Sequence, residues 1–358
     1  MAKVLLTGAF GNVGEYTLRE LVAQGHEVTA LDAATDATRA KASRLDGELR
    51  FRTAWCDLTD ADATRAAVVD AAPDAVLHVA AVIAPLAYVR PALAERVNVD
   101  GTRNLIAAAQ AAGGPRFVFT SSYSVHGPRN PHRGLPPIDG ATPVDPRDNY
   151  GRHKVIGEED TRASGLPWTV IRLPAVASLD PGFGRDPAFL RFGSVIDPDQ
   201  RRHGGDVRDV ALAFTHSVEA DVVGRDLVVA GDASWALVAR EHMRAILAAR
   251  GLPPLPDSSF RRADPAVDDA WYFEDTVDTT ESQRLLDYQR HTFDDYLDAV
   301  RRSAGASRHL LRVVGPLVVR GMVRRSPYQG TDPSRPDARS VWEHVCELFP
   351  GADASSTA

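Results

Sequence analysis

Residues 7–14 read TGAFGNVG, and this short stretch decides the fold prediction. An apolar run at residues 4–7 precedes it, and a helical pattern follows it. In a strand–loop–helix unit, Gly8 permits a tight turn, Gly11 lets the backbone approach a pyrophosphate, and Gly14 lets helix and strand pack closely. The helix N-terminus offers free N–H groups and a partial positive charge to phosphates. The stretch therefore predicts a dinucleotide-binding loop.

An acidic residue at the end of the second apolar run predicts which dinucleotide binds. Asp32 lies 18 residues beyond Gly14 and closes the run at residues 28–31. Its carboxylate can accept hydrogen bonds from both ribose hydroxyls of NAD, whereas its charge would repel a 2′-phosphate. The nearest cation that follows it is Arg39. We therefore expect NAD rather than NADP as the cofactor.

Short apolar runs alternate with helical patterns through the first half of the chain. The runs expected as strands are 4–7, 28–31, 49–54, 75–79, 117–120 and 168–172. Helices are expected between them, among them 97–112 and 150–163. Runs that are apolar throughout are typical of parallel strands covered on both faces. The predicted fold class is therefore α/β, with a Rossmann-type doubly wound parallel sheet.

The regular alternation fades after Pro174, and the chain divides into three predicted parts. Residues 1–174 form an NAD-binding Rossmann domain, residues 175–303 a smaller, irregular α/β substrate region, and residues 304–358 a C-terminal helical tail. This division allows segments of residues 175–303 to add strands or helices to the Rossmann sheet. In that part we expect helices at 207–219, 237–250 and 294–303 and a strand at 227–230.

The tail begins with a basic and apolar segment. Residues 304–325 carry five arginines and no acidic residue, so the rest of the chain has a net charge of −12. A basic amphipathic helix at a membrane surface is one interpretation of this segment. Because Gly315-Pro316 is expected to interrupt the helix, we favour a pair of helices docked on the body of the protein or at a subunit interface.

Composition excludes several classes of protein for this chain of 358 residues. Its net charge of −7 argues against nucleic acid as a partner. No apolar run reaches 18 residues, so no transmembrane span is expected, and the start MAKVLLTG is too short for a signal peptide. Cys56 and Cys346 are too few for a disulfide framework or a zinc site. We therefore expect a cytoplasmic protein with reduced cysteines and no metal.

A second motif carries acid–base chemistry. Tyr150 and Lys154 are four residues apart in a predicted helix and so lie on one face of it. Ser121 and Ser122 end the fifth predicted strand, at the edge where open α/β sheets bind ligands. A nearby ammonium lowers the pKa of a tyrosine from its ordinary value of about 10. Such a tyrosine can exchange a proton with a substrate hydroxyl, while a serine holds the substrate oxygen.

Further stretches follow these two motifs in a recognisable order. They are CDLTD (56–60), HVAA (78–81), NVDGTRN (98–104), FTSSYSVHG (119–127), RLP (172–174) and GGDVRDVALA (204–213). With the glycine loop, Asp32 and YGRHK (150–154), they make the chain resemble the extended short-chain dehydrogenase/reductase superfamily, often called the NAD-dependent epimerase/dehydratase family. The resemblance spans residues 1 to about 215, and DTTESQRLL (278–286) extends it to about 303.

This resemblance implies a role for individual residues. Ser122, Tyr150 and Lys154 would form the catalytic set, with Lys154 also bonded to the nicotinamide ribose. Ser122 is preferred to its neighbour because the pattern S-x-x-V-[YH]-G begins there. The other residues expected at the cofactor are Gly8, Phe10, Gly11, Asn12, Val13, Gly14, Asp32, Asp57, Leu58, Val79, Ala80, Ala81, Asn98, Ser121 and Pro174, of which Asp57 and Leu58 would hold the adenine.

Departures from the family pattern narrow the reaction. Tyr123 and Ser124 stand where dehydratases of the nucleotide-sugar branch carry an acidic pair, which argues against dehydration. Ala175 follows RLP, where sugar-nucleotide epimerases usually carry an asparagine that binds the diphosphate. His126 replaces the usual tyrosine of the V-Y-G motif. We expect His126 in the wall of the site or against the substrate, and Ser124 near the substrate.

Two other groups of polar residues have a structural and a functional interpretation. Arg201, Arg202 and His203 form either a solvated loop or a site for an anionic substrate. Asp206 and Asp209 belong to a stretch that the family uses structurally, so a catalytic role for this carboxylate pair is not favoured.

Three functions fit the sequence. We expect an NAD-dependent oxidoreductase that interconverts a secondary alcohol and a ketone. An epimerase of sugars or sugar nucleotides, which would use the same residues and regenerate its cofactor in place, is the second, although Ala175 counts against it. The third is a non-catalytic NAD-binding protein. The partner is a small molecule, and the resemblance implies a homodimer formed through the helices at 97–112 and 150–163.

Overall fold

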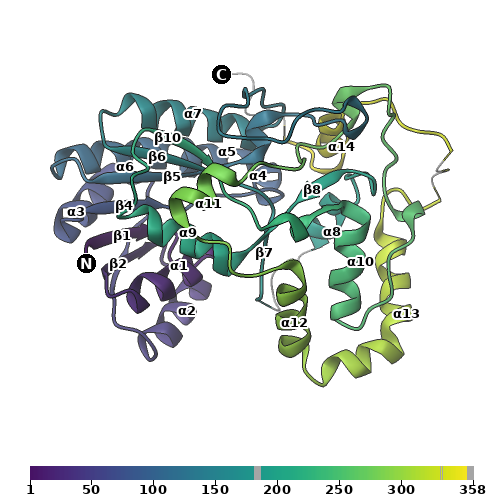
Figure 1. Ribbon diagram of the computed structural model, residues 1–358, viewed down its shortest axis with the longest axis horizontal. Coiled ribbons are helices and arrows are strands. Elements are labelled where there is room, and N and C mark those ends of the chain that lie inside the picture. Colours follow the sequence, from purple (N-terminus) through teal and green to yellow (C-terminus); the bar gives the residue numbers. More distant parts are fainter. Residues whose placement is uncertain (181–186, 331, 333, 353–358) are drawn as a thin grey trace.

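The computed structural model describes residues 1–180, 187–330, 332 and 334–352. A seven-stranded parallel sheet lies at the centre of its larger part (Figure 1). The strand order is β3-β2-β1-β4-β5-β6-β10, and every pairing is parallel. The strands are β1 (Lys3–Thr7), β2 (Glu27–Asp32), β3 (Arg52–Trp55), β4 (Ala75–His78), β5 (Arg116–Ser122), β6 (Trp168–Leu173) and β10 (Arg225–Val228). The predicted doubly wound Rossmann-type sheet is confirmed.

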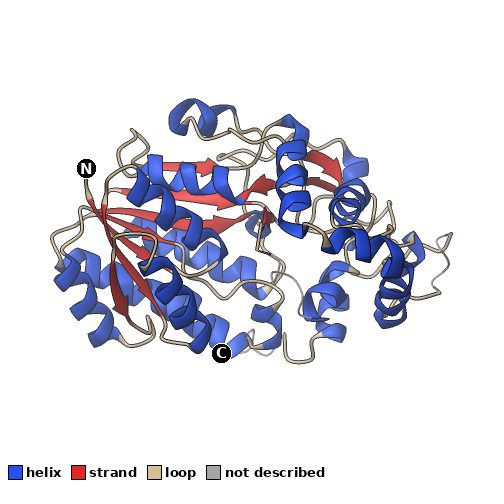
Figure 2. Cartoon of the chain, turned by 90° about the horizontal axis from the view of Figure 1, so that it is seen from below, coloured by secondary structure: helices blue, strands red, loops and turns tan. Residues whose placement is uncertain are grey.

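Helices cover both faces of this sheet, as Figure 2 shows. One face carries α1 (Asn12–Ala23), α2 (Asp36–Asp46) and α9 (Val207–Ser217). The other carries α3 (Ala61–Ala71), α6 (Gly101–Ala111) and α7 (Asn149–Ala163). The shorter helices α4 (Leu86–Val89), α5 (Pro91–Glu95) and α11 (Thr280–Leu286) complete this part. The helix predicted at 97–112 begins as a π-helical turn, Arg96–Asp100, and continues as α6.

Alternate residues of each strand pack into two separate cores. Leu6, Leu77 and Ile171 are buried against α1 and α9. Leu5 and Val170 are buried on the opposite face, against α3 and α6. Because side chains alternate along a strand, a strand buried on both faces must be apolar throughout. The continuous apolar runs of the sequence therefore correspond to central strands.

A smaller region lies beyond the carboxyl ends of the strands. It contains two two-stranded sheets, formed by β7 (Val176–Ala177) with β9 (Gly205–Asp206) and by β8 (Arg201–His203) with β11 (Ala236–Val238). Its helices are α8 (Pro187–Gly193), α10 (Ala239–Ala249) and α12 (Phe293–Ala304). The helix predicted at 237–250 begins only at Ala239, because the two residues before it pair with β8. Although α9 and β10 fall within residues 175–303, they belong to the Rossmann layers.

The C-terminal tail differs from its prediction. A single helix, α13 (Ser307–Arg325), replaces the expected pair, and Pro316 lies inside it. A proline fits a helical backbone but leaves one carbonyl without its usual donor. Here Pro316 is exposed, so water can reach the backbone at this turn. A second helix, α14 (Val341–Leu348), packs back against α8. No helix in the described part of the chain is long and apolar enough to cross a bilayer.

A buried histidine in α10 predicts how stability depends on pH. His242 stacks on Phe293 at 5.0 Å, and burial lowers its pKa to about 3. Between pH 6.5 and 3 the unfolded chain binds a proton that the folded chain does not, so stability falls as the pH drops. At pH 5 this histidine is expected to cost about 2 kcal/mol relative to pH 7.

Denaturant titrations at pH 7 and pH 5 test this expectation. The variant His242→Phe should lose about 2 kcal/mol less than the unmodified chain over that interval. The exposed His309, changed to Gln, serves as the matched control and should leave the difference unchanged. An equal loss in the unmodified chain and in His242→Phe would contradict the assignment.

Candidate active site

The glycine loop turns directly from β1 into α1. Gly8 has φ +65°, and a Cβ placed on it would lie 2.7 Å from the Cα of Ala80. A Cβ on Gly14 would overlap the carbonyl oxygen of Gly8. The N-cap of α1 is Gly11, which provides no side-chain cap, so the first N–H groups of the helix can donate to a ligand. Close packing without side chains and a helix N-terminus together fit a pyrophosphate.

Two other residues of the loop contribute in different ways. Phe10 is buried, and its ring lies 5.5 Å from that of Trp55. Asn12 begins α1, and its Oδ1 is buried without a hydrogen-bond partner in the described structure. Val13 follows it and accepts a hydrogen bond from Thr17 at 2.9 Å. An acceptor such as Asn12 Oδ1 without a partner fits a site that a polar ligand completes.

Asp32 is fixed at the end of β2 by the backbone around it. The N–H of Phe10 donates to one carboxylate oxygen at 2.9 Å, and the N–H of Ala33 donates to the other at 2.8 Å. Burial raises the pKa of Asp32 above its ordinary value, and these two hydrogen bonds oppose that shift. Arg39 stacks on Trp55 at 5.1 Å. The carboxylate is therefore held beside the glycine loop, where the ribose of a bound dinucleotide lies in this fold.

A buried chain of hydrogen bonds lies beneath the loop. The hydroxyl of Thr7 lies 2.8 Å from His78 Nδ1, and His78 Nε2 lies 2.9 Å from the hydroxyl of Thr102. Thr102 in turn donates to the carbonyl of Asn98 at 2.7 Å. Burial lowers the pKa of His78 to about 3, so the ring is neutral and can accept one bond while donating another. This chain ties β1, β4 and α6 together under the expected cofactor.

Asn98 closes the loop that follows β4. Its Oδ1 accepts from the N–H of Val82 at 2.8 Å, and its Nδ2 donates to the carbonyl of Val82 at 2.9 Å. Val79, Ala80 and Ala81 form the segment between β4 and this clamp. Of these, Ala80 packs closely against Gly8 of the glycine loop.

The remaining residues expected at the cofactor lie at the ends of other strands. Asp57 accepts from the N–H and the hydroxyl of Thr59, both at 2.9 Å. Leu58 is buried, and its carbonyl accepts from Asn104 at 2.8 Å. These two residues follow β3, whereas Pro174 follows β6. All of them therefore lie at the carboxyl edge of the sheet.

Ser122, Tyr150 and Lys154 come together at this same edge. Ser122 ends β5, and the other two lie in the first turns of α7. The Lys154 Nζ lies 5.8 Å from the centre of the Tyr150 ring and donates to the carbonyl of Thr120 at 2.8 Å. Ser122 lies close enough to the Tyr150 phenol to favour its ionised form. The spacing of four residues thus brings phenol, ammonium and hydroxyl together at one place.

The electrostatics of this group differ in one respect from the expectation. Burial raises the pKa of Tyr150, and the nearby Ser122 hydroxyl opposes the rise only in part. Burial also lowers the pKa of Lys154 to about 7. The sequence predicted that the ammonium would lower the pKa of the tyrosine, but the loss of hydration on burial is the largest effect and raises it.

The start of α7 is held in place by Asp148. This residue caps the helix by accepting from the N–H of Gly151 at 2.9 Å. Its second oxygen accepts from the Tyr88 hydroxyl at 2.5 Å. Burial raises the pKa of Asp148 to about 6, although both hydrogen bonds act against the rise. The tyrosine two residues further on is therefore positioned by a buried contact with α4.

The C-terminal tail reaches the same place. Tyr88 packs against the rings of Phe192, Trp342 and Phe349, with centres 5.6, 5.4 and 6.2 Å away. The Asn149 amide donates to the carbonyl of Ala352 at 3.3 Å. Helix α14 thus belongs to the apolar cluster that also contains Tyr150. Nothing in the sequence indicated that the tail would return to the catalytic helix.

Ser121 has a different environment from its neighbour. Its hydroxyl donates to Glu158 at 2.6 Å, and Arg172 binds both oxygens of that carboxylate at 2.9 Å. Burial raises the pKa of Glu158, but the hydrogen bonds from Arg172, Ser121 and Arg162 bring it below the ordinary value. Glu158 follows Lys154 by four residues, so the helical spacing was a usable signal for this network. The Ser121 hydroxyl is therefore part of a buried polar network between β5, β6 and α7.

Ser124 and His126 lie in the short helical turn Tyr123–His126 that follows β5. Ser124 Oγ lies 3.4 Å from Ser122 Oγ, so it adjoins the group of Ser122, Tyr150 and Lys154. His126 Nδ1 lies 3.0 Å from the carbonyl of Pro143, and burial lowers the pKa of this histidine to about 4. A neutral, buried ring of this kind is typical of a wall residue.

The cluster of Arg201, Arg202 and His203 is neutralised. Arg201 pairs with Asp275 at 2.8 Å, and Arg202 pairs with Glu274 at 2.7 Å. His203 Nε2 lies 3.0 Å from the carbonyl of Gly231. The expected solvated loop is wrong, because these residues form strand β8 and His203 is buried, and paired carboxylates leave no free arginine here for an anionic substrate. The carboxylates Asp206 and Asp209 are also engaged, with Arg208 and with His291 respectively.

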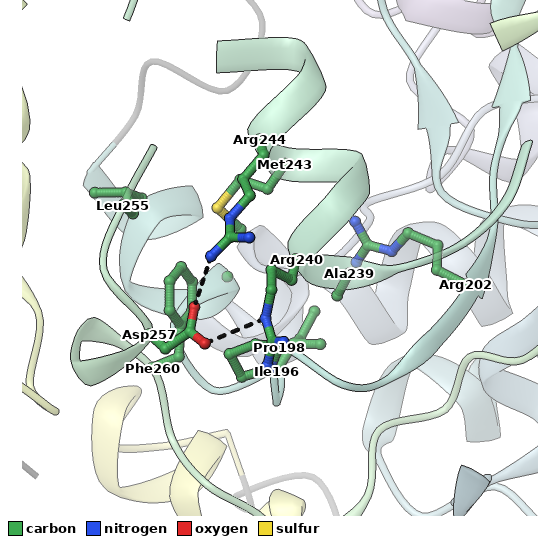
Figure 3. A pocket seen from close by; sticks show the side chains of 11 residues that line it. Ile196, Pro198, Arg202, Ala239, Arg240, Met243, Arg244, Leu255, Asp257 and Phe260 are labelled. Carbon is green, nitrogen blue, oxygen red and sulfur yellow. Dashed lines mark ion pairs between the residues drawn. The ribbon is translucent and has the colours of Figure 1, made fainter. Parts of the chain in front are cut away.

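A small cavity of about 70 Å³ lies between α10 and the loop that follows it (Figure 3). Arg240 and Arg244 reach into it from α10, and both pair with Asp257. Arg202 lies at its edge. The remaining lining is largely apolar, from side chains such as Met243 and Phe260. The guanidinium groups around this cavity are therefore balanced by carboxylates.

Comparisons with known proteins agree with this geometry. A model of the NAD dependent epimerase/dehydratase family matches residues 4–230. The D-erythronate dehydrogenase of Cupriavidus necator is 33% identical over 189 residues, which cover 50% of this chain and 56% of that protein. The UDP-glucose 4-epimerase of Mycolicibacterium smegmatis is 33% identical over 234 residues, covering 65% and 67%. The chain thus spans only part of the length of the curated relatives.

Solved structures share the fold. The UDP-Glc/GlcNAc 4-epimerase of Campylobacter jejuni has a TM-score of 0.66 at 21% identity, covering 87% of this chain and 100% of that chain. The Bordetella bronchiseptica enzyme WbmG, solved in complex with NAD and UDP, has a TM-score of 0.64 at 21% identity, covering 84% and 94%. The chain belongs to the NAD dependent epimerase/dehydratase family, of the extended short-chain dehydrogenase/reductase type, and its cofactor is NAD.

Proposed function

We propose that the chain is an NAD-dependent oxidoreductase that interconverts a secondary alcohol and a ketone. The observation that carries the proposal is the meeting of Tyr150, Ser122 and Lys154 at the sheet edge beside the glycine loop. A phenol, a hydroxyl and an ammonium in that arrangement can transfer one proton and stabilise one developing negative charge. A non-catalytic NAD-binding protein has no need for this set.

Each residue then has a distinct role. NAD supplies the hydride acceptor when it is bound. Tyr150 accepts the proton of the substrate hydroxyl during oxidation and returns it during reduction. Ser122 donates a hydrogen bond to the substrate oxygen, and Lys154 stabilises the phenolate and binds the nicotinamide ribose. Burial of Tyr150 and Lys154 excludes water from both groups and strengthens these interactions.

The second candidate function is that of an epimerase of sugars or sugar nucleotides. The relatives of the chain include such an enzyme, the UDP-glucose 4-epimerase of Mycolicibacterium smegmatis. A nucleotide diphosphate needs cations or amides that are free to bind it. Several arginines in and beside the smaller region are instead paired with carboxylates: Arg129 and Arg201 with Asp275, Arg202 with Glu274, Arg240 with Asp199 and Asp257, and Arg262 with Asp197. Ala175 offers no amide. These features favour the oxidoreductase, and relatives of that kind include a 3-beta-hydroxysteroid dehydrogenase of Mycolicibacterium neoaurum.

Cofactor retention separates the two candidates. The protein is purified without added cofactor and denatured, and the nicotinamide released per chain is quantified. We expect little bound NAD, together with ready binding of added NAD, because an oxidoreductase exchanges its cofactor in every turnover. A nearly stoichiometric yield would favour an epimerase that regenerates its cofactor in place.

The carboxylate of Asp32 predicts the choice between NAD and NADP. Replacing Asp32 by Ala removes the negative charge next to the position of a 2′-phosphate, so the ratio of the two dissociation constants is expected to shift towards NADP by at least about tenfold. Titrations with both cofactors measure that ratio. Asp36→Ala, at the exposed start of α2, is the matched control. An unchanged ratio in Asp32→Ala would show that another group selects the cofactor.

Several features of the proposal go beyond the residues of the site. The division at residues 174 and 303, the homodimer formed through α6 and α7 and the cytoplasmic location all stay predictions. The substrate is proposed as a small molecule that carries a secondary hydroxyl or a ketone.

A further inference from the structure

One face of α13 is docked on the body of the protein. Gly315 and Val319 are buried, and a Cβ on Gly315 would lie 2.8 Å from Pro253. This close approach fixes which side of the helix points inwards. In Figure 1 the helix forms the outer edge of the smaller region. Its other side therefore faces away from the molecule.

That outer side carries large apolar groups. Leu310 is 64% exposed, Val313 is 78% exposed and Leu317 is 72% exposed. Positions i, i+3 and i+7 of an α-helix lie on one face, so the three side chains form a stripe. A stripe of this kind in contact with water is unfavourable, and it indicates a surface that has a partner.

The charge of the helix indicates what the partner is. Residues 304–325 contain five arginines and no acidic residue. They are Arg308, Arg312, Arg320, Arg324 and Arg325. Within the described residues none of the five forms an ion pair, in contrast to the arginines around α10. This surface is therefore complementary in charge to an anionic partner.

We propose that α13 binds the surface of an anionic lipid bilayer and lies in the plane of that surface. Leu310, Val313 and Leu317 would enter the boundary between headgroups and acyl chains. Arg320 and Arg324 follow Leu317 by three and seven residues and so lie on the same side of the helix, where they would contact lipid phosphates. The helix is not apolar enough to cross the bilayer, so the contact is peripheral. The inference concerns the tail and does not depend on the proposed reaction.

Two other partners fit the surface less well. A second copy of the chain, related by a two-fold axis through this face, would bring ten arginines together without acidic residues from α13 to balance them. A nucleic acid would balance the arginines but would leave the apolar stripe in water. A bilayer with anionic headgroups satisfies both features of the helix.

Co-sedimentation of the full chain with vesicles tests the proposal. One set of vesicles contains phosphatidylcholine alone, and the other contains phosphatidylcholine with phosphatidylglycerol. We expect binding to the anionic vesicles, at least about tenfold weaker binding to the neutral ones, and loss of binding at high salt. Equal binding to both sets, or binding to neither, would overturn the proposal.

Variants separate the two parts of the surface. Leu317→Glu and the double variant Arg320→Gln/Arg324→Gln should each weaken binding to anionic vesicles by about tenfold or more. Val223→Glu, at an apolar residue that is 43% exposed elsewhere, is the matched control and should bind normally. Circular dichroism establishes that each variant is folded.

The same variants distinguish membrane binding from the two alternative partners, a second copy of the chain and a nucleic acid. A chain that is dimeric in sedimentation, becomes monomeric with Leu317→Glu and ignores vesicles would overturn the proposal in favour of self-association. Binding to a nucleic acid duplex that is lost in Arg320→Gln/Arg324→Gln but kept in Leu317→Glu, without vesicle binding, would overturn it in favour of a nucleic acid.

Discussion

Replacing Tyr150 by phenylalanine is expected to lower kcat about a thousandfold while NAD binding stays unchanged. The phenol is the proposed proton acceptor, and it lies beside Ser122 and Lys154. Among the described residues of the site, we expect no other side chain to replace it in that role. The ring itself is buried, and phenylalanine preserves its packing. The loss should therefore fall on the chemical step.

Steady-state kinetics with the first substrate identified, together with an NAD titration, measure both effects. Tyr123→Phe is a matched control, because Tyr123 is also buried and its hydroxyl has no hydrogen-bond partner among the described residues. It should keep nearly full activity. If Tyr150→Phe turned over at the unmodified rate, the proposed role of the phenol would be wrong.

Replacing Gly14 by alanine is expected to weaken cofactor binding strongly. An added Cβ would overlap the carbonyl oxygen of Gly8, so the loop or the start of α1 must shift. The pyrophosphate site depends on the same close approach. We expect the NAD dissociation constant to rise by at least about a hundredfold, which corresponds to about 3 kcal/mol.

Gly47→Ala is a suitable control for this variant. Gly47 ends α2 with a negative φ of −72°, and an added Cβ would make only an ordinary contact, 3.6 Å from the carbonyl of Arg44. Calorimetric titration with NAD compares the two variants, and thermal unfolding verifies that both are folded. A folded Gly14→Ala that binds NAD with undiminished affinity would contradict the account of the loop.

The sheet was predictable because each strand can be recognised from its own short stretch of apolar sequence. Each central strand is buried on both faces, so its sequence is apolar throughout and stands out from the helices around it. The predicted bounds of the edge strand β3 were the least accurate: the strand was expected at residues 49–54 and is observed at Arg52–Trp55. An edge strand is more exposed and therefore carries a weaker apolar signal.

The meeting of Ser122, Tyr150 and Lys154 was predictable because helical spacing and strand ends decide it. Tyr150 and Lys154 share a helix face, and Ser122 ends a strand, so the topology alone brings them together. The Asp148–Tyr88 contact and the return of α14 depend on packing between segments far apart in the chain. The raised pKa of Tyr150 likewise depends on burial, which the sequence does not specify.

Helix α13 shows the limit of a local rule. Gly315-Pro316 predicted an interruption, but the helix continues through it. Packing of Gly315 against Pro253 holds the helix on the body, and the exposed position of Pro316 leaves its turn open to water. Contacts between distant residues thus outweighed the helix-breaking tendency of a single residue.

A deuterium-transfer measurement tests the central claim most directly. The full chain is incubated with NAD and a panel of cyclic and open-chain secondary alcohols that carry deuterium on the carbinol carbon, and the nicotinamide is analysed by mass spectrometry. The account predicts that deuterated NADH accumulates with at least one alcohol and that Tyr150→Phe prevents it. Bound NAD without any deuterium transfer, or conversion of a sugar substrate without net NADH, would contradict it.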